Sequence, residues 1–170
     1  MKIFRDKRFS VLWTILRIWL GYEWLTAGIE KVTGQGWVGS KAGTAITGFL
    51  KGALAKATGD HPLVQGWYAS FVKDFALPNA KIFSYLVASG EILVGISLIL
   101  GALTIVGLIA GAFMNLNYML AGTTSINPNM YTVAILLMAA GANAYIFGLD
   151  RFILPMLGKS FNKKSRSIIS

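Results

Sequence analysis

The stretch AKIFSYLVASGEILVGISLIL, residues 80–100, decides the fold. It is mostly apolar, and a helix needs about 20 such residues to cross the ~30 Å hydrocarbon core of a bilayer. After Gly101 and Ala102 a second apolar run begins, LTIVGLIAGAFMNLNYMLA at 103–121. With so short a connection, the two runs are expected to form a tight antiparallel hairpin of helices.

Two further apolar runs lie outside this hairpin, FSVLWTILRIWLGYEWLTAGI at 9–29 and MYTVAILLMAAGANAYIFGL at 130–149. The run at 9–29 is too long for the apolar core of a signal peptide, so we interpret it as a retained span. Asn127-Pro128 supplies a turn before the run at 130–149. The sequence therefore predicts an all-α fold, an integral membrane four-helix bundle in a single domain over residues 1–170.

The net charge of +9 is concentrated in the tails of the chain. The basic residues there are Lys2, Arg5, Lys7, Arg8, Arg151, Lys159, Lys163, Lys164 and Arg166. Basic residues that flank spans indicate topology and attraction to lipid headgroups, which argues against a nucleic-acid partner and for the lipid bilayer. The positive-inside rule places both termini, with the basic tail 151–170, in the cytoplasm and the connection 30–78 outside.

The long connection 30–78 predicts structure of its own, an outer cap. Apolar residues recur at the spacing of one helical face, namely Ile46, Phe49, Leu50, Ala53, Leu54 and Ala57. The segment 66–77 repeats the pattern with Trp67, Phe71, Val72 and Phe75. We expect two short amphipathic helices that lie on the membrane surface or cap the outer mouth of the bundle.

The chain contains no cysteine and a single histidine, His61. Disulfides, Fe–S clusters and thiolate metal sites are therefore excluded within this chain, and so is a haem held by two histidines. No haem, metal or cluster is expected, and any redox chemistry must use a diffusible cofactor.

Ionisable residues within the spans are the candidates for chemistry, since each costs roughly 2.5–3.5 kcal/mol to insert. Arg17 and Glu23 lie in the run at 9–29, and Glu91 lies in the run at 80–100. Arg17 shares a helical face with Gly21 and Gly28, which indicates a face packed on other helices. Further polar or aromatic candidates are Trp24, Lys31, Asn115, Asn117, Tyr118 and Asn143.

Two interpretations of these residues remain open. In the first, Arg17 forms a structural ion pair with Glu23 or Glu91, and the asparagines hold helices together by hydrogen bonds. In the second, Arg17, Glu23 and Glu91 are catalytic groups in a polar pocket for a small anion or a quinone headgroup. The binding residues would then be Lys31, Trp24, Asn115, Asn117, Tyr118 and Asn143.

Several strings of the sequence resemble one family. LRIWLGYEWLTAGIEKV at 16–32 and SGEILVGISLILG at 89–101 are similar to signatures of the DoxX/DoxD membrane family, and the resemblance continues through NYMLAG at 117–122, INPN at 126–129 and GLDR at 148–151. The long connection with its tryptophans resembles the DoxD branch, which includes the large subunit of thiosulfate:quinone oxidoreductase.

This resemblance implies a multi-pass protein of a prokaryotic cell membrane. It also implies oxidation of thiosulfate to tetrathionate at the outer face, with electrons passed to membrane quinone. A DoxA-like small subunit would be a separate partner, because no such region is apparent in this chain.

Three functional hypotheses follow. In the first, a quinone-linked oxidoreductase subunit, thiosulfate meets Arg17 and Lys31, quinone enters from the lipid, and Glu23 or Glu91 takes up protons. The second is a non-catalytic subunit that docks onto a respiratory or redox complex such as a terminal oxidase. The third is a small transporter of an anion or a lipophilic compound. Whether the chain forms a homo-oligomer stays open.

Overall fold

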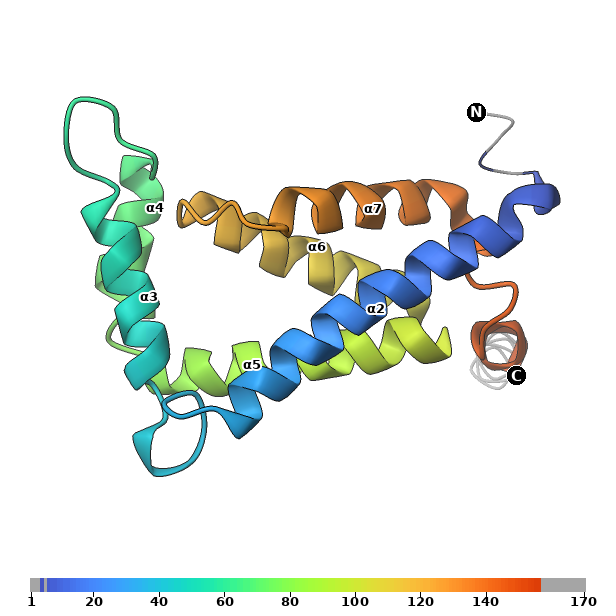
Figure 1. Cartoon of the computed structure of the whole chain (residues 1–170), viewed down its shortest axis with the longest axis horizontal. Coiled ribbons are helices and arrows are strands. Elements are labelled where there is room, and N and C mark those ends of the chain that lie inside the picture. The colour runs from blue at the N-terminus through green and yellow to red at the C-terminus, as the bar shows by residue number, and fades with distance from the viewer. Residues whose placement is uncertain (1–3, 5, 157–170) are drawn as a thin grey trace, which may run out of the picture.

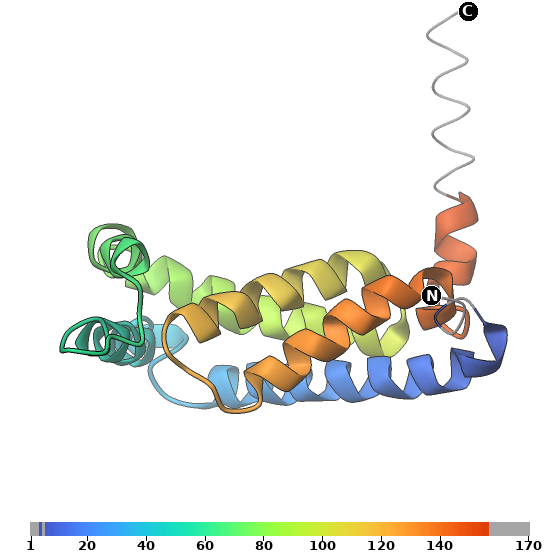
Figure 2. The ribbon, with the colours of Figure 1, turned by 90° about the horizontal axis from the view of Figure 1, so that it is seen from above.

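The computed structural model describes residue 4 and residues 6–156, and over these residues the chain forms helices and turns with no strand. Four helices make the body: α2 (Ser10–Thr33), α5 (Ala80–Leu100), α6 (Thr104–Leu120) and α7 (Asn127–Ala140). α2 packs along α5, α5 along α6, and α6 along α7, and α2 also contacts α7 (Figures 1 and 2). The all-α prediction and the α5–α6 hairpin are confirmed.

The connection after α2 folds into a cap, which consists of α3 (Thr44–Ala55), α4 (Gly66–Phe71) and the π-helical turn η3 (Val72–Ala76). Figure 1 shows α3 and α4 lying across the end of the bundle where α2 ends and α5 begins. Ile46, Leu50 and Tyr68 are buried in a core that the cap shares with the start of α5 and the end of α6. The two predicted amphipathic helices are therefore present, and they cap the bundle.

Glycines set the contact between α2 and α5. A Cβ atom added at Gly95 would lie 2.6 Å from the backbone nitrogen of Leu25, and one added at Gly28 would lie 2.8 Å from that of Ile92. Such distances leave no room for a side chain, so the two backbones touch. The expectation that the small-residue faces pack on other helices is correct, and these contacts fix the register of α2 along α5.

The ends of two predicted spans differ from the helices. α2 continues to Thr33 rather than ending near 29, and α7 ends at Ala140 rather than 149. α7 stops early because Gly141 has a φ of 56°, a positive value that breaks the helix, and a 3₁₀ turn follows (Gly141–Ala144).

By length and composition, one described helix, Ala80–Leu100, is able to cross a membrane. Thr104–Leu120 is apolar but has only 17 residues. α2 is 24 residues long but carries Arg17 and Glu23, and α7 has only 14 residues. The predicted packing of four helices is thus present, whereas four membrane crossings are not established by this criterion.

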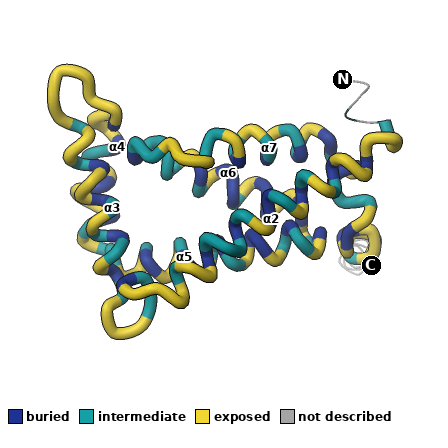
Figure 3. The backbone as a smooth tube through the Cα atoms, viewed as in Figure 1, coloured by how far each residue is buried: buried dark blue, intermediate teal, exposed yellow. Residues whose placement is uncertain are grey.

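The outer surface of the bundle is apolar along three helices. Figure 3 shows the exposed positions along them. The exposed large side chains are Val11, Leu12, Ile15 and Ile18 on α2, Ile82, Leu86, Leu93 and Ile96 on α5, and Val106, Ile109, Phe113 and Leu116 on α6. Soluble monomers rarely expose continuous apolar surface of this extent. The surface is suited to contact with hydrocarbon.

At the end of the bundle opposite the cap, the segment after α7 is tied to the α5–α6 turn. The Asp150 carboxylate is 2% exposed and accepts hydrogen bonds from the backbone N–H groups of Leu103 (2.6 Å) and Thr104 (2.8 Å). These groups belong to the start of α6, whose N–H groups have no helical partner, so Asp150 caps this helix from a distant part of the chain. The backbone N–H of Asp150 also donates to the Gly101 carbonyl oxygen at 2.8 Å.

We expect Asp150→Asn to lower the free energy of unfolding by about 2 kcal/mol, because an amide offers one acceptor oxygen where the carboxylate offers two charged ones. Denaturant titration in detergent micelles measures this. Asp74→Asn, at an exposed position of the cap, is the matched control. Equal stability of the two variants would show that Asp150 does not hold the turn.

Candidate functional site

A cavity of about 590 Å³ lies where the cap meets the bundle. Its walls come from the second half of α2, the first half of α5, the end of α6, the α6–α7 loop and the cap. Among its lining residues are Glu23, Trp24, Lys31, Trp37, Phe49, Tyr68, Phe83, Glu91, Asn117 and Tyr118. Most of the lining is apolar or aromatic, and a few polar groups converge in it, which is the usual composition of a small-molecule site.

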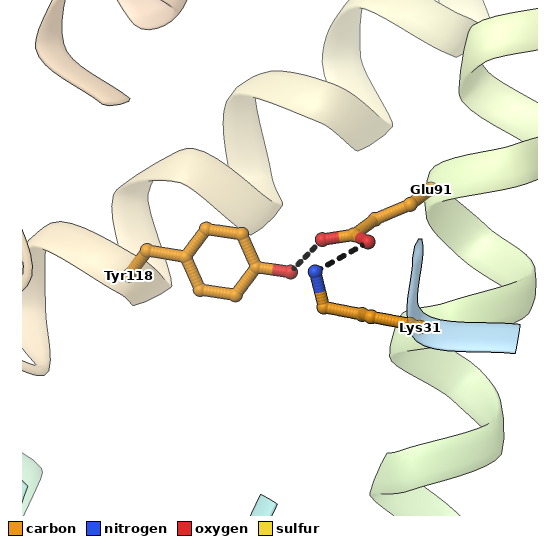
Figure 4. Close-up of polar contacts among 3 residues, drawn as sticks. All are labelled: Lys31, Glu91 and Tyr118. Atoms are coloured by element: carbon orange, nitrogen blue, oxygen red, sulfur yellow. Dashed lines mark hydrogen bonds and ion pairs between the residues drawn. The ribbon is translucent and has the colours of Figure 1, made fainter. Parts of the chain in front are cut away.

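Three polar side chains from three helices meet in the cavity wall (Figure 4). Lys31 Nζ of α2 lies 2.8 Å from Glu91 Oε2 of α5, and the Tyr118 hydroxyl of α6 donates to Glu91 Oε1 at 2.6 Å. The Glu91 side chain is 1% exposed, and that of Lys31 is 20% exposed. A buried carboxylate requires partners of this kind, since desolvation would otherwise outweigh its other interactions. We call these residues the Lys31–Glu91–Tyr118 cluster.

Trp37 completes the surroundings of the lysine. The Lys31 ammonium lies 5.1 Å from the centroid of the Trp37 ring, which is within the range of a cation–π interaction. The backbone oxygen of Trp37 accepts a hydrogen bond from the Ser84 hydroxyl, which fixes the loop after α2 against α5. The ammonium is thus held by an anion and an aromatic face while remaining partly accessible.

The cap is attached to α6 beside the cavity. The Tyr68 hydroxyl donates to the backbone oxygen of Asn117 at 3.0 Å and lies 3.3 Å from its Oδ1. The Asn117 amide nitrogen donates to the Phe113 carbonyl oxygen at 2.8 Å. Burial raises the pKa of Tyr68 above its usual value, so its hydroxyl stays a neutral donor.

The structure brings six of the predicted site residues together at the cavity and leaves three elsewhere. Glu23, Trp24, Lys31, Glu91, Asn117 and Tyr118 line the cavity. Asn143 lies near the start of α2, where its amide donates to the Phe4 carbonyl oxygen at 2.9 Å. Asn115 is fully buried in α6, and its amide has no hydrogen-bond partner among the described residues. Trp37 and Glu30 also line the cavity, and sequence reasoning did not select them.

Arg17 is the main correction, because it neither lines the cavity nor forms the ion pair with Glu23 or Glu91 that the first interpretation expected. Its guanidinium donates instead to the carbonyl oxygens of Leu98 and Ile99, in the last turn of α5. The reason is the register of two antiparallel helices. Gly28 of α2 lies against Glu91 and Ile92, so a residue three turns earlier on α2 meets the far end of α5.

The charges that line the cavity are unequal in number. Glu23, Glu30 and Glu91 supply carboxylates, and Lys31 supplies the ammonium. Glu91 already neutralises Lys31, so Glu23 and Glu30 leave an excess of negative charge. The field in the cavity therefore favours neutral or cationic groups over anions.

A protein-family model described as DoxX matches residues 12–124, from the first turn of α2 to the loop after α6. The match includes every helix that contributes to the Lys31–Glu91–Tyr118 cluster, while the strings at 126–129 and 148–151 lie outside it. No curated protein and no solved structure matches the chain.

Proposed function

The chain belongs to the DoxX family of membrane proteins, and from this premise we propose that it is the quinone-binding membrane subunit of an oxidoreductase. The observation that carries the proposal is the cavity of about 590 Å³ with the Lys31–Glu91–Tyr118 cluster in its wall. The site would hold a quinone ring at the end of the bundle that the cap covers.

The proposal includes four membrane crossings, with both termini cytoplasmic and the cap outside. Its support is the exposed apolar surface along α2, α5 and α6. This surface extends beyond α5, the one described helix that is long and apolar enough to cross a membrane. The charged residues of α2 do not lie on this apolar surface, since Arg17 is buried against α5, Lys31 is paired, and Glu23 and Glu30 line the cavity. The basic tails support the orientation.

The residues present fit a quinone. Cavities of roughly 300–1,000 Å³ commonly hold small ligands, and this one is within that range. Aromatic and aliphatic side chains such as Trp24, Phe49 and Phe83 suit a flat apolar ring. Lys31, which is partly exposed, is a donor for a ring carbonyl oxygen.

A bound quinone supplies an acceptor for two electrons and two protons. Within the chain, Lys31 Nζ would orient a carbonyl oxygen by a charge-assisted hydrogen bond. Glu91 lies 2.8 Å from this ammonium and 2.6 Å from the Tyr118 hydroxyl. Glu91 and Tyr118 are thus positioned to hold a proton and pass it on at this point.

Thiosulfate, which the family resemblance implies as the electron donor, is a poor match for the cavity itself. A dianion would meet the excess carboxylates Glu23 and Glu30, and Arg17 lies at the other end of the bundle. We therefore propose that the reductant is held by a partner, such as a DoxA-like small subunit, and not beside the Lys31–Glu91–Tyr118 cluster.

The alternative is a non-catalytic subunit that binds a quinone and docks onto a respiratory complex. A specific observation favours it, namely that the chain contains no cysteine and one histidine, so it has few groups with which to carry electrons. Both hypotheses require quinone binding in the cavity. They differ in whether purified protein with a reductant and its partner reduces quinone.

The test is a titration of purified protein in lipid nanodiscs with a short-chain ubiquinone, read by quenching of tryptophan fluorescence. Two of the chain's five tryptophans, Trp24 and Trp37, line the cavity, so a quinone bound there would quench their fluorescence. Tyr118→Phe and Glu91→Gln each remove one polar partner with little change in shape. Each is expected to weaken binding about tenfold, because Glu91, which Tyr118 holds in place, fixes the Lys31 ammonium that would bind the ring carbonyl oxygen.

Lys51→Met and Asp74→Asn are the controls, because both residues are exposed in the cap and do not line the cavity. They should bind as the wild type does. Saturable quenching that is unchanged in Tyr118→Phe and Glu91→Gln would place the quinone elsewhere. No saturable quenching in the wild type would refute the proposal.

A further inference from the structure

The cavity has two sides of opposite character. Toward the α6–α7 loop, polar residues line the cavity: Glu23, Thr26 and Glu30 from α2, Thr123 and Ser125 from the loop, and Asn127 at the start of α7. Toward the gap between α5 and α6, the lining residues are Phe71, Phe83, Leu86, Val87, Phe113 and Met114. A ligand in the cavity therefore has a polar boundary on one side and an apolar boundary on the other.

The apolar side lies where α5 and α6 diverge. Away from the cap the two helices are in contact, since a Cβ atom at Gly107 would lie 2.6 Å from Ser97 Oγ, and one at Gly90 would lie 3.3 Å from Met114 Sδ. Figure 1 shows α5 and α6 separating toward the cap. At the cap end, the ring of Phe71 packs edge-on against Phe83 of α5, and both side chains line the cavity.

Leu86 of α5 and Phe113 of α6 line the cavity and also belong to the outer surface of the bundle. Leu86 is 59% exposed, and it follows Ile82 by one turn on the apolar outer stripe of α5. Phe113 is 66% exposed and continues the stripe that Val106 and Ile109 form on α6. The same two side chains thus face the cavity and the surface that suits hydrocarbon.

From this juxtaposition we infer a lipid-facing portal between α5 and α6, framed by Leu86 and Phe113, that admits the hydrocarbon tail of a bilayer-soluble ligand. The ring of the ligand lies at the Lys31–Glu91–Tyr118 cluster, and the tail leaves through the portal into the acyl chains. This inference rests on the proposed function for the identity of the ring, but not for the existence of the opening.

A first experiment tests the opening without any ligand. Because the chain has no cysteine, Phe113→Cys carries a single fluorophore, and its quenching by brominated-chain phospholipids in nanodiscs reports contact with acyl chains. Val106→Cys is the positive control on the same stripe, and Glu30→Cys samples the polar side. We expect the fluorophore at position 113 to be quenched as strongly as the one at position 106 and more strongly than the one at position 30. If the fluorophore at position 113 is quenched no more strongly than the one at position 30, the portal is overturned.

A second experiment closes the portal. In the variant Leu86→Cys/Phe113→Cys, a bifunctional maleimide tethers α5 to α6 across the opening. Leu93→Cys/Ile109→Cys places the same tether on the outer stripes below the Gly90–Met114 contact, as the matched control. We expect the portal tether to slow the binding of a long-tailed ubiquinone about tenfold, because an obstructed route lowers the association rate, and to leave a tail-free benzoquinone analogue unaffected.

The outcomes separate the portal from the proposed function. Equal binding rates for the long-tailed quinone with the portal tether and with the control tether would overturn the portal. If the tail-free analogue also slows by the same factor, the tether distorts the cavity and the opening is not a tail route, which again counts against the portal. If neither quinone binds the untethered protein, the proposed function fails, and the lipid-quenching result still decides whether the opening faces acyl chains.

Discussion

Arg17→Ala is expected to lower the free energy of unfolding by about 3 kcal/mol or more, through structure and not through chemistry. The side chain is 1% exposed, and its guanidinium donates to the carbonyl oxygens of Leu98 and Ile99 at the end of α5. Alanine would leave these carbonyl groups unsatisfied and a void where the side chain was, and the two costs add.

Denaturant titration in mixed micelles measures this effect. Arg17→Lys should retain part of the stability, because an ammonium on a long stem can still donate to one of the carbonyl groups. Lys51→Ala, at an exposed position of the cap, should unfold as the wild type does. An Arg17→Ala protein with wild-type stability but no quinone reduction would contradict this prediction and restore Arg17 as a catalytic candidate.

Lys31→Met is also expected to lower the free energy of unfolding by about 3 kcal/mol. The substitution keeps the aliphatic stem but leaves the Glu91 carboxylate, 1% exposed, without its counter-ion. Removal of one partner of a buried pair typically costs roughly 3–5 kcal/mol, because the remaining charge is uncompensated. Lys31 is 20% exposed, so solvent screens part of the interaction, and we expect the lower end of that range.

The double variant Lys31→Met/Glu91→Gln tests whether this loss of stability comes from the ion pair. A neutral amide in place of the carboxylate no longer needs a counter-ion, and its oxygen still accepts from the Tyr118 hydroxyl. The double variant should therefore be more stable than Lys31→Met alone, with a coupling energy of about 1 kcal/mol or more in the double-mutant cycle. Strictly additive effects of the two substitutions would mean that the ion pair does not stabilise the fold.

These two predictions divide the ionisable residues of the bundle by role. Arg17 and Asp150 both act at the end of the bundle opposite the cap, where they satisfy backbone groups of α5 and α6. Lys31 and Glu91 lie in the wall of the cavity. Arg17 and Asp150 therefore hold the helices together at one end of the molecule, and the candidate site lies at the other end.

The sequence by itself determined the local elements of this protein. Apolar runs of membrane-span length predicted α5 and its hairpin with α6, and the helical spacing of residues such as Ile46 and Leu50 predicted α3. Small residues beside Arg17 correctly indicated a helix-packing face. Each of these inferences depends on neighbours within a few turns of one helix, and such neighbours are visible in a linear sequence.

Only the tertiary structure decided which charged groups meet. Arg17, Glu23 and Lys31 all lie on α2, and nothing in their spacing tells which of them faces Glu91. That choice depends on the register of α2 along α5, which is set where Gly28 and Gly95 let the two backbones touch. A shift of one turn would bring a different residue to Glu91, because each turn moves the helix by about 5.4 Å. Contacts between segments more than fifty residues apart thus placed Lys31 in the site and Arg17 outside it.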